Sequence, residues 1–70
     1  MKSFYTEGNK ITFKGIRGTI TKITETYRKN VIVVKIQHVP PYLKNEYRGV
    51  NSIGLFEHPD GKLEYMTVVD

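Results

Sequence analysis

The side chains that offer acid–base catalysis or metal binding are His38, Glu57, His58 and Asp60. The last three share one turn, where an imidazole and two carboxylates form the ligand set of a weak metal site. Asp60 is expected instead to accept a hydrogen bond from its own turn backbone, and His58 to lie at the edge of the turn. His38 has no partner at a recognisable spacing, which indicates a loop or strand-end residue. We therefore predict no enzymatic activity, no metal and no cofactor.

A second group of residues has the chemistry of a protein interface and lies in the only long irregular stretch, residues 37–49. These residues are Pro40, Pro41, Tyr42, Leu43 and Tyr47. The two prolines cannot donate hydrogen bonds to a sheet, so the pairing of the preceding strand must end there. The tyrosines and the leucine are residue types that anchor interfaces, which makes the segment a candidate docking site for a protein. The alternative is that the same side chains fold back and anchor a loop over one end of the domain.

Five segments have the pattern of β-strands, and none has a convincing helical pattern. They cover residues 10–14, 19–24, 31–36, 50–57 and 62–69. Residues 15–18 (Gly-Ile-Arg-Gly) supply a glycine turn between the first two segments. Residues 58–61 (His-Pro-Asp-Gly) separate the last two, with Pro59 at the second position of a type I turn and Gly61 in the left-handed region that follows. The chain is therefore expected to form about five antiparallel strands.

Alternation of polar and apolar residues indicates which side chains face the core. Residues 31–36 form a β-branched run expected to be the central strand, in the register that points Lys35 outward, because the opposite register would bury its charge. Phe4 and Tyr5 are expected to cover the folded domain or to form part of a short first strand. The predicted core consists of Ile11, Phe13, Ile20, Ile23, Ile32, Val34, Ile36, Ile53, Leu55, Leu63 and Tyr65.

Length and composition limit the class of protein. A chain of 70 residues has no room for a second core, so residues 1–70 are expected to form a single domain. The absence of cysteine excludes disulfides and thiol chemistry and fits a reducing cytoplasm. No apolar run approaches the roughly 18 residues of a membrane helix, and residues 1–8 lack the apolar stretch of a signal peptide, so we expect a cytoplasmic protein without membrane contact. Eight Lys against three Arg, with frequent Ile and Asn, suit an AT-rich bacterial or phage genome.

The net charge of +4 is distributed unevenly along the chain. Residues 1–35 contain eight Lys or Arg and two Glu, for a net charge of +6. Residues 36–70 contain three Lys or Arg and five Asp or Glu, for a net charge of −2. This polarity favours an anionic partner for the first half of the chain, although basic surface residues also serve solubility.

One stretch combines an apolar strand, a glycine turn, a basic loop and a Val-rich strand. Within it Gly18 is followed by a polar residue, Thr19, and an aliphatic one, Ile20, with a second aliphatic residue, Ile23, three positions later. This spacing resembles the KOW motif of ribosomal proteins and transcription elongation factors, and the resemblance covers residues 11–36, about a third of the chain. It implies an SH3-like small barrel, a fold that five short strands without a helix favour independently.

The resemblance also implies contact with nucleic acid or a nucleoprotein complex through loops and one barrel face. The matching residues, with two lysines on nearby outward faces, are Lys14, Arg17, Tyr27, Arg28, Lys29 and Lys35. Lys and Arg neutralise phosphates and release counterions, and an exposed Tyr gives a base a surface to stack on. The alternative is structural, because loops and outward strand positions are where Lys and Arg normally lie, and Tyr27 is a candidate cap for the barrel end.

We therefore predict a small binding module without enzymatic activity that contacts nucleic acid or a nucleoprotein. The alternative function is a protein-interaction module, such as a bacterial or phage regulator of a host protein, which would use the segment from Pro40 to Tyr47. The expected oligomeric state is a monomer or a weak dimer, because an exposed edge strand can pair two copies.

Overall fold

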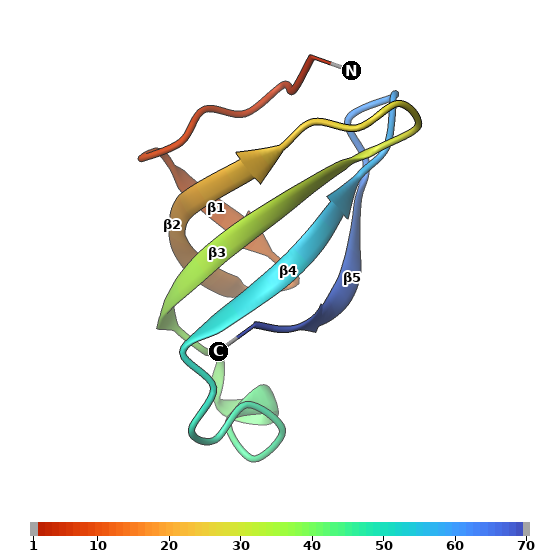
Figure 1. Cartoon of the computed structure of the whole chain (residues 1–70). Helices are drawn as coiled ribbons and strands as arrows, with labels where there is room; N and C mark the ends of the chain where they lie inside the picture. The colour runs from red at the N-terminus through yellow and green to blue at the C-terminus, as the bar shows by residue number, and fades with distance from the viewer. Residues whose placement is uncertain (1, 70) are drawn as a thin grey trace.

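The computed structural model describes residues 2–69, and its regular secondary structure is almost entirely β (Figure 1). The strands are β1 (Lys10–Phe13), β2 (Ile16–Thr24), β3 (Asn30–His38), β4 (Ser52–Glu57) and β5 (Leu63–Val68). A single turn of 3-10 helix, η1 (Pro41–Leu43), follows β3. The strands pair antiparallel in the order β1-β2-β3-β4-β5, and the sheet curls into a half-barrel with β1 and β5 at its edges. The prediction of about five antiparallel strands is confirmed.

The core lies on the concave face of the curled sheet. Its buried side chains are Ile11, Phe13, Ile16, Ile20, Ile32, Val34, Ile53 and Leu55. β3 is the central strand and Lys35 is exposed, as the charge of its side chain required. Burial of these aliphatic side chains is the main force that holds five short strands together.

The margin of the core differs from the expectation on β5. Ile23, Ile36 and Leu63 are half-buried and pack against the core. Tyr65 was expected inside, but its side chain is 38% exposed. The reason is that β5 is an edge strand of an open sheet, so no further strand covers Tyr65 on that side. Its ring instead meets the ring of Tyr47 edge to face, with 6.4 Å between the ring centroids.

The turn between β1 and β2 is shorter than the sequence indicated. Only Lys14 and Gly15 form it, both in the left-handed region with φ of 50° and 85°. β2 therefore begins at Ile16, which is buried, and the prediction of a turn over residues 15–18 is wrong. Gly18 serves another purpose inside β2, because a methyl group there would overlap the carbonyl oxygen of Lys35 and approach Val34 Cγ1 to 2.6 Å. The missing side chain lets β2 and β3 approach closely.

The hairpin between β4 and β5 follows the predicted turn chemistry. The N–H of His58 donates to the carbonyl of Lys62 (2.9 Å), and Gly61 adopts a left-handed φ of 88°. The carboxylate of Asp60 accepts a hydrogen bond from the backbone N–H of Lys62 at 2.9 Å. Asp60 is thus bonded to its own turn, as expected.

A buried polar network joins the end of β4 to the N-terminal strap, which we define as residues 2–9. Glu57 is fully buried. Its Oε1 accepts hydrogen bonds from Ser3 Oγ (2.6 Å) and Asn30 Nδ2 (3.1 Å), and its Oε2 accepts from the backbone N–H of Phe4 (2.7 Å). Asn30, also fully buried, uses its own oxygen to accept from the N–H of Thr26 (3.2 Å). Desolvation raises the pKa of Glu57, but the three hydrogen bonds together lower it by more, so that the pKa lies below its ordinary value.

The N-terminal strap does not form the short strand that was one of two expectations for it. Tyr5 is half-buried and packs against the core, whereas the side chain of Phe4 is exposed and its ring lies beside Gly61. The strap is therefore held by polar contacts with Glu57 at its start, by hydrogen bonds of Glu7, Gly8 and Asn9 with β2, and by one covering tyrosine.

Candidate nucleic-acid interface

The outward side of β1, β2 and β3 carries positive charge only. These three strands contain no Asp or Glu. Their exposed cations, which we call the basic face, are Lys10, Arg17, Lys22 and Lys35. Alternation in the strands produces this segregation, because every second side chain points away from the core and the outward positions hold Lys, Arg, Thr and Gln together with the uncharged Val31 and Val33. The basic face thus has the charge that an anionic ligand requires.

The register of the sheet arranges the basic face in rows. Lys10 lies opposite Thr19, and Thr19 lies opposite Lys35, so these three side chains form one row across β1, β2 and β3. Arg17 lies opposite both Thr12 and His38 in the next row. Neighbouring strands are about 4.8 Å apart, so each row is only about 10 Å wide.

The cations of the basic face have no carboxylate partners within the sheet. Among residues 2–69, the one ion pair joins His58 Nε2 to Glu64 Oε1 at 2.7 Å, near the β4–β5 turn. Lys10 is held by neutral groups, because its Nζ donates to Thr19 Oγ1 (3.1 Å) and to Gln37 Oε1 (2.8 Å). The positive charge of the face is therefore not neutralised internally.

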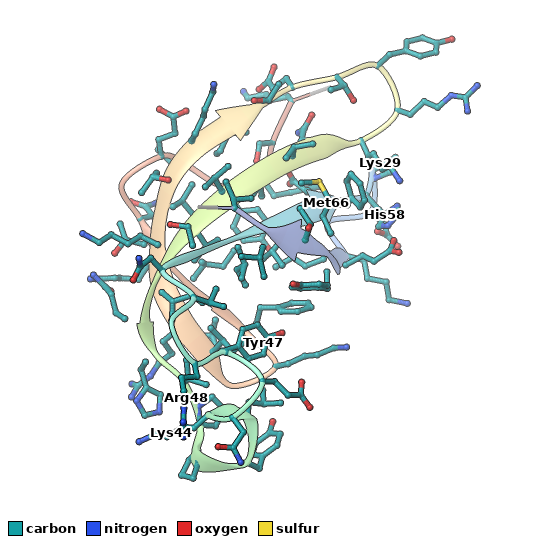
Figure 2. All side chains as sticks on the ribbon, turned by 60° about the horizontal axis from the view of Figure 1, so that its bottom comes forward. Lys29, Lys44, Tyr47, Arg48, His58 and Met66 are labelled. Atoms are coloured by element: carbon teal, nitrogen blue, oxygen red, sulfur yellow. The ribbon has the colours of Figure 1, made fainter. Side chains whose placement is uncertain are left out.

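The six residues named from the KOW resemblance fall into two groups. Arg17 and Lys35 lie on the basic face, with Lys14 in the β1–β2 turn beside it. Tyr27, Arg28 and Lys29 lie in the β2–β3 loop, beyond the other end of β2, a strand of nine residues that spans about 30 Å. Figures 1 and 2 show this loop at the end of the sheet opposite to η1. The structure therefore does not bring all six residues into one site.

Within the loop, Tyr27 and Lys29 have different environments. Tyr27 is 92% exposed, so the expectation that it caps the barrel end is wrong, and its ring is free to stack on a ligand. Lys29 is half-buried, with Nζ 3.8 Å from the centroid of the Phe56 ring. This cation–π contact gives Lys29 a structural role.

The segment from Pro40 to Tyr47 uses most of its apolar side chains internally. Pro40 is buried, and Leu43 and Tyr47 pack against the core. Tyr42 is 75% exposed, but its hydroxyl donates to the carbonyl of Lys14 at 3.2 Å. The segment is a loop with one 3-10 turn, anchored over the end of the sheet as the structural alternative described. Pro41 and one side of Tyr42 remain exposed.

The residues considered for catalysis or metal binding are not gathered in one place. Glu57 is buried and accepts hydrogen bonds from Ser3 and Asn30, whereas His58 is paired with Glu64 at the surface. In the described part of the chain, no group of three or more His, Asp or Glu side chains has the arrangement of a metal site. His38 is the last residue of β3 and is exposed, in agreement with the prediction of a strand-end residue. Residues 2–69 contain no helix with the length and hydropathy of a membrane span.

The prediction from sequence did not include Lys10 and Lys22, which share the basic face with Arg17 and Lys35. It also did not place His38 opposite Arg17. The alternation in residues 10–14 does mark Lys10 as outward-facing. What the sequence lacks is the register that places Lys10 and Lys35 on either side of Thr19, and Arg17 beside His38.

Comparison of the chain with family models, with curated proteins and with solved structures found no match.

Proposed function

We propose that this protein is a non-enzymatic module that binds nucleic acid through its basic face. The observation that supports the proposal is the outward surface of β1–β3, where four Lys or Arg side chains are exposed and the strands contain no carboxylate. Such a surface contacts phosphates rather than base edges, so binding is expected to depend strongly on salt and weakly on sequence.

The same proposal includes the fold family. Five short antiparallel strands in meander order, curled around one core, support an SH3-like barrel that is open between β1 and β5. In this arrangement β1, β2 and β3 present the basic face, and the β2–β3 loop presents Tyr27 as a separate surface for stacking.

The test is a titration of labelled single- and double-stranded RNA and DNA, followed by fluorescence anisotropy at several salt concentrations. Arg17→Glu with Lys35→Glu reverses two charges of the basic face. Lys2→Glu with Lys62→Glu is the matched control, because it changes the net charge equally at exposed positions outside strands β1–β3. Circular dichroism and thermal unfolding verify that both variants fold.

We expect the first variant to lose binding and the control to retain most of it. Each phosphate contact removed lowers the salt slope by about 0.7 for single strands or 0.9 for duplexes, so the slope should fall by about 1.4 to 1.8. Equal losses in both variants would reduce the effect to net charge, and absence of binding by the parent protein would refute the proposal. Binding of a protein partner that is lost in the Tyr42→Ala variant would favour the protein-interaction module instead.

A further inference from the structure

A shallow hollow of about 430 Å³ lies at the edge of the basic face where β3 ends. Its lining residues are Lys10, Ile11, Thr12, Arg17, Gly18, Gln37 and His38. Three of them have basic side chains with nitrogen donors, and each comes from a different strand: Lys10 from β1, Arg17 from β2 and His38 from β3. None of the lining residues is acidic. The hollow is thus a concave site with convergent donors for an anion.

A β-bulge shapes this hollow. Arg17 pairs with His38 and Gly18 pairs with Ile36, so Gln37 is the extra residue of β3. Because of the bulge, the consecutive residues Gln37 and His38 are both exposed, whereas strict alternation would turn one of them inward. Bulges re-aim side chains and are frequent beside functional sites. Here the bulge sets the imidazole next to Arg17.

One further feature prepares the site for a ligand. The Nζ of Lys10 is held by Thr19 Oγ1 and Gln37 Oε1, so two of its three hydrogens are used and one is left for a ligand. The ammonium is therefore positioned before a ligand arrives, which reduces the entropic cost of binding.

We propose that this hollow is a phosphate subsite that prefers a terminal phosphate monoester of a nucleic acid over an internal phosphodiester. Internal phosphodiesters carry one negative charge, whereas a terminal monoester approaches two negative charges at neutral pH and offers three acceptor oxygens. Lys10, Arg17 and His38 supply donors from three strands, which matches the larger charge and number of acceptors of the monoester better. The inference rests on the proposed function for the identity of the ligand but not for the chemistry of the hollow.

The experiment uses one oligonucleotide in three forms: with a 5′-hydroxyl, with a 5′-phosphate, and with a 5′-hydroxyl and one additional nucleotide. The last form controls for the added charge with an internal phosphodiester. Inorganic phosphate alone is titrated in parallel while NMR follows the side-chain signals of Arg17 and His38. His38→Gln tests the subsite, and His58→Gln, at the β4–β5 turn, is the matched control.

We expect the oligonucleotide with a 5′-phosphate to bind about tenfold more tightly than either other form, because its terminal phosphate gains charge-assisted hydrogen bonds in the hollow. His38→Gln should reduce this preference while leaving binding of the 5′-hydroxyl form intact, and His58→Gln should change neither. Oligonucleotides that bind without preference, with no NMR response to phosphate, would overturn the subsite and leave the proposed function standing. A response of Arg17 and His38 to phosphate, without binding of any oligonucleotide, would support the subsite and overturn the proposed function.

Discussion

Replacement of Glu57 by glutamine is the most direct test of the buried network. The carboxylate accepts hydrogen bonds on both oxygens, from Ser3 and Asn30 on Oε1 and from the backbone of Phe4 on Oε2. A glutamine amide in place of Oε2 would face the N–H of Phe4. In place of Oε1 it would face the amide of Asn30, which cannot turn over without releasing the N–H of Thr26. Either orientation brings two donors together.

The expected cost of Glu57→Gln follows from this geometry. Loss of a hydrogen bond to a charged group costs about 1.5–3 kcal/mol, and a buried donor left unsatisfied costs about 1–3 kcal/mol more. We therefore expect the free energy of unfolding at pH 7 to fall by about 3 kcal/mol or more, out of roughly 4–10 kcal/mol for a chain of this size. Glu64→Gln is the control, because this exposed pair with His58 contributes about 1 kcal/mol at most.

Urea unfolding followed by circular dichroism between pH 7 and pH 3 measures both quantities. Because the pKa of Glu57 is lower in the folded protein than its ordinary value of 4.5, its stabilising contribution is complete above pH 4.5 and is lost as the pH falls through the folded pKa. The difference between the parent and Glu57→Gln should therefore shrink in acid. A loss below 1 kcal/mol at pH 7, or a difference that does not change between pH 7 and pH 3, would refute this account of the network.

Three further predictions concern other parts of the fold. Gly18→Ala should lower the free energy of unfolding by about 2 kcal/mol in the same urea assay, because the added methyl group meets the backbone of β3. Gly54→Ala should lower it by less than about 1 kcal/mol, because there the methyl group meets the flexible end of Met66 at 2.7 Å. Burial and the neighbouring Tyr65 raise the pKa of Tyr47, so the contribution of its neutral hydroxyl to stability is complete below pH 10.0 and is lost as the pH rises through the pKa of the folded protein. Urea unfolding of the parent and of Tyr47→Phe across this pH range tests this, because only the parent should lose that contribution. Tyr27→Ala should leave the melting temperature unchanged, because the ring is exposed, and equal affinity of this variant for single strands would exclude stacking at the loop.

The strand positions were predictable because the alternation of apolar and polar residues was strong. The burial of Ile11 and Phe13 in β1, and the outward orientation of Lys35 in β3, follow directly from that pattern. The start of β2 could not be predicted in the same way. Glycine at position 18 is typical of a turn, whereas its role in the close approach of β2 and β3 depends on tertiary packing. Tyr65 was misplaced because the sequence does not show whether a sheet closes.

The candidate site was only partly predictable, for a reason of geometry. Charge and residue type indicated Arg17 and Lys35, but their neighbours Lys10 and His38 are set by strand register and by the bulge at Gln37. Neither feature has a local signal in the sequence. The burial of Glu57 was equally hidden, since its donors come from residues more than 50 positions earlier and from the start of β3.

The distance in sequence between Glu57 and the N-terminal strap also fixes an order of events during synthesis. Ser3 and Phe4 lie 54 and 53 residues before the carboxylate that holds them, so they leave the ribosome long before it. The hairpin contacts of β1 with β2 and of β2 with β3 involve residues closer in sequence and close their loops at lower entropic cost. The part of the strap around Ser3 and Phe4 therefore cannot dock fully before Glu57 has been made, and a nascent chain that has not reached residue 57 must keep Ser3 and Phe4 without their final partner.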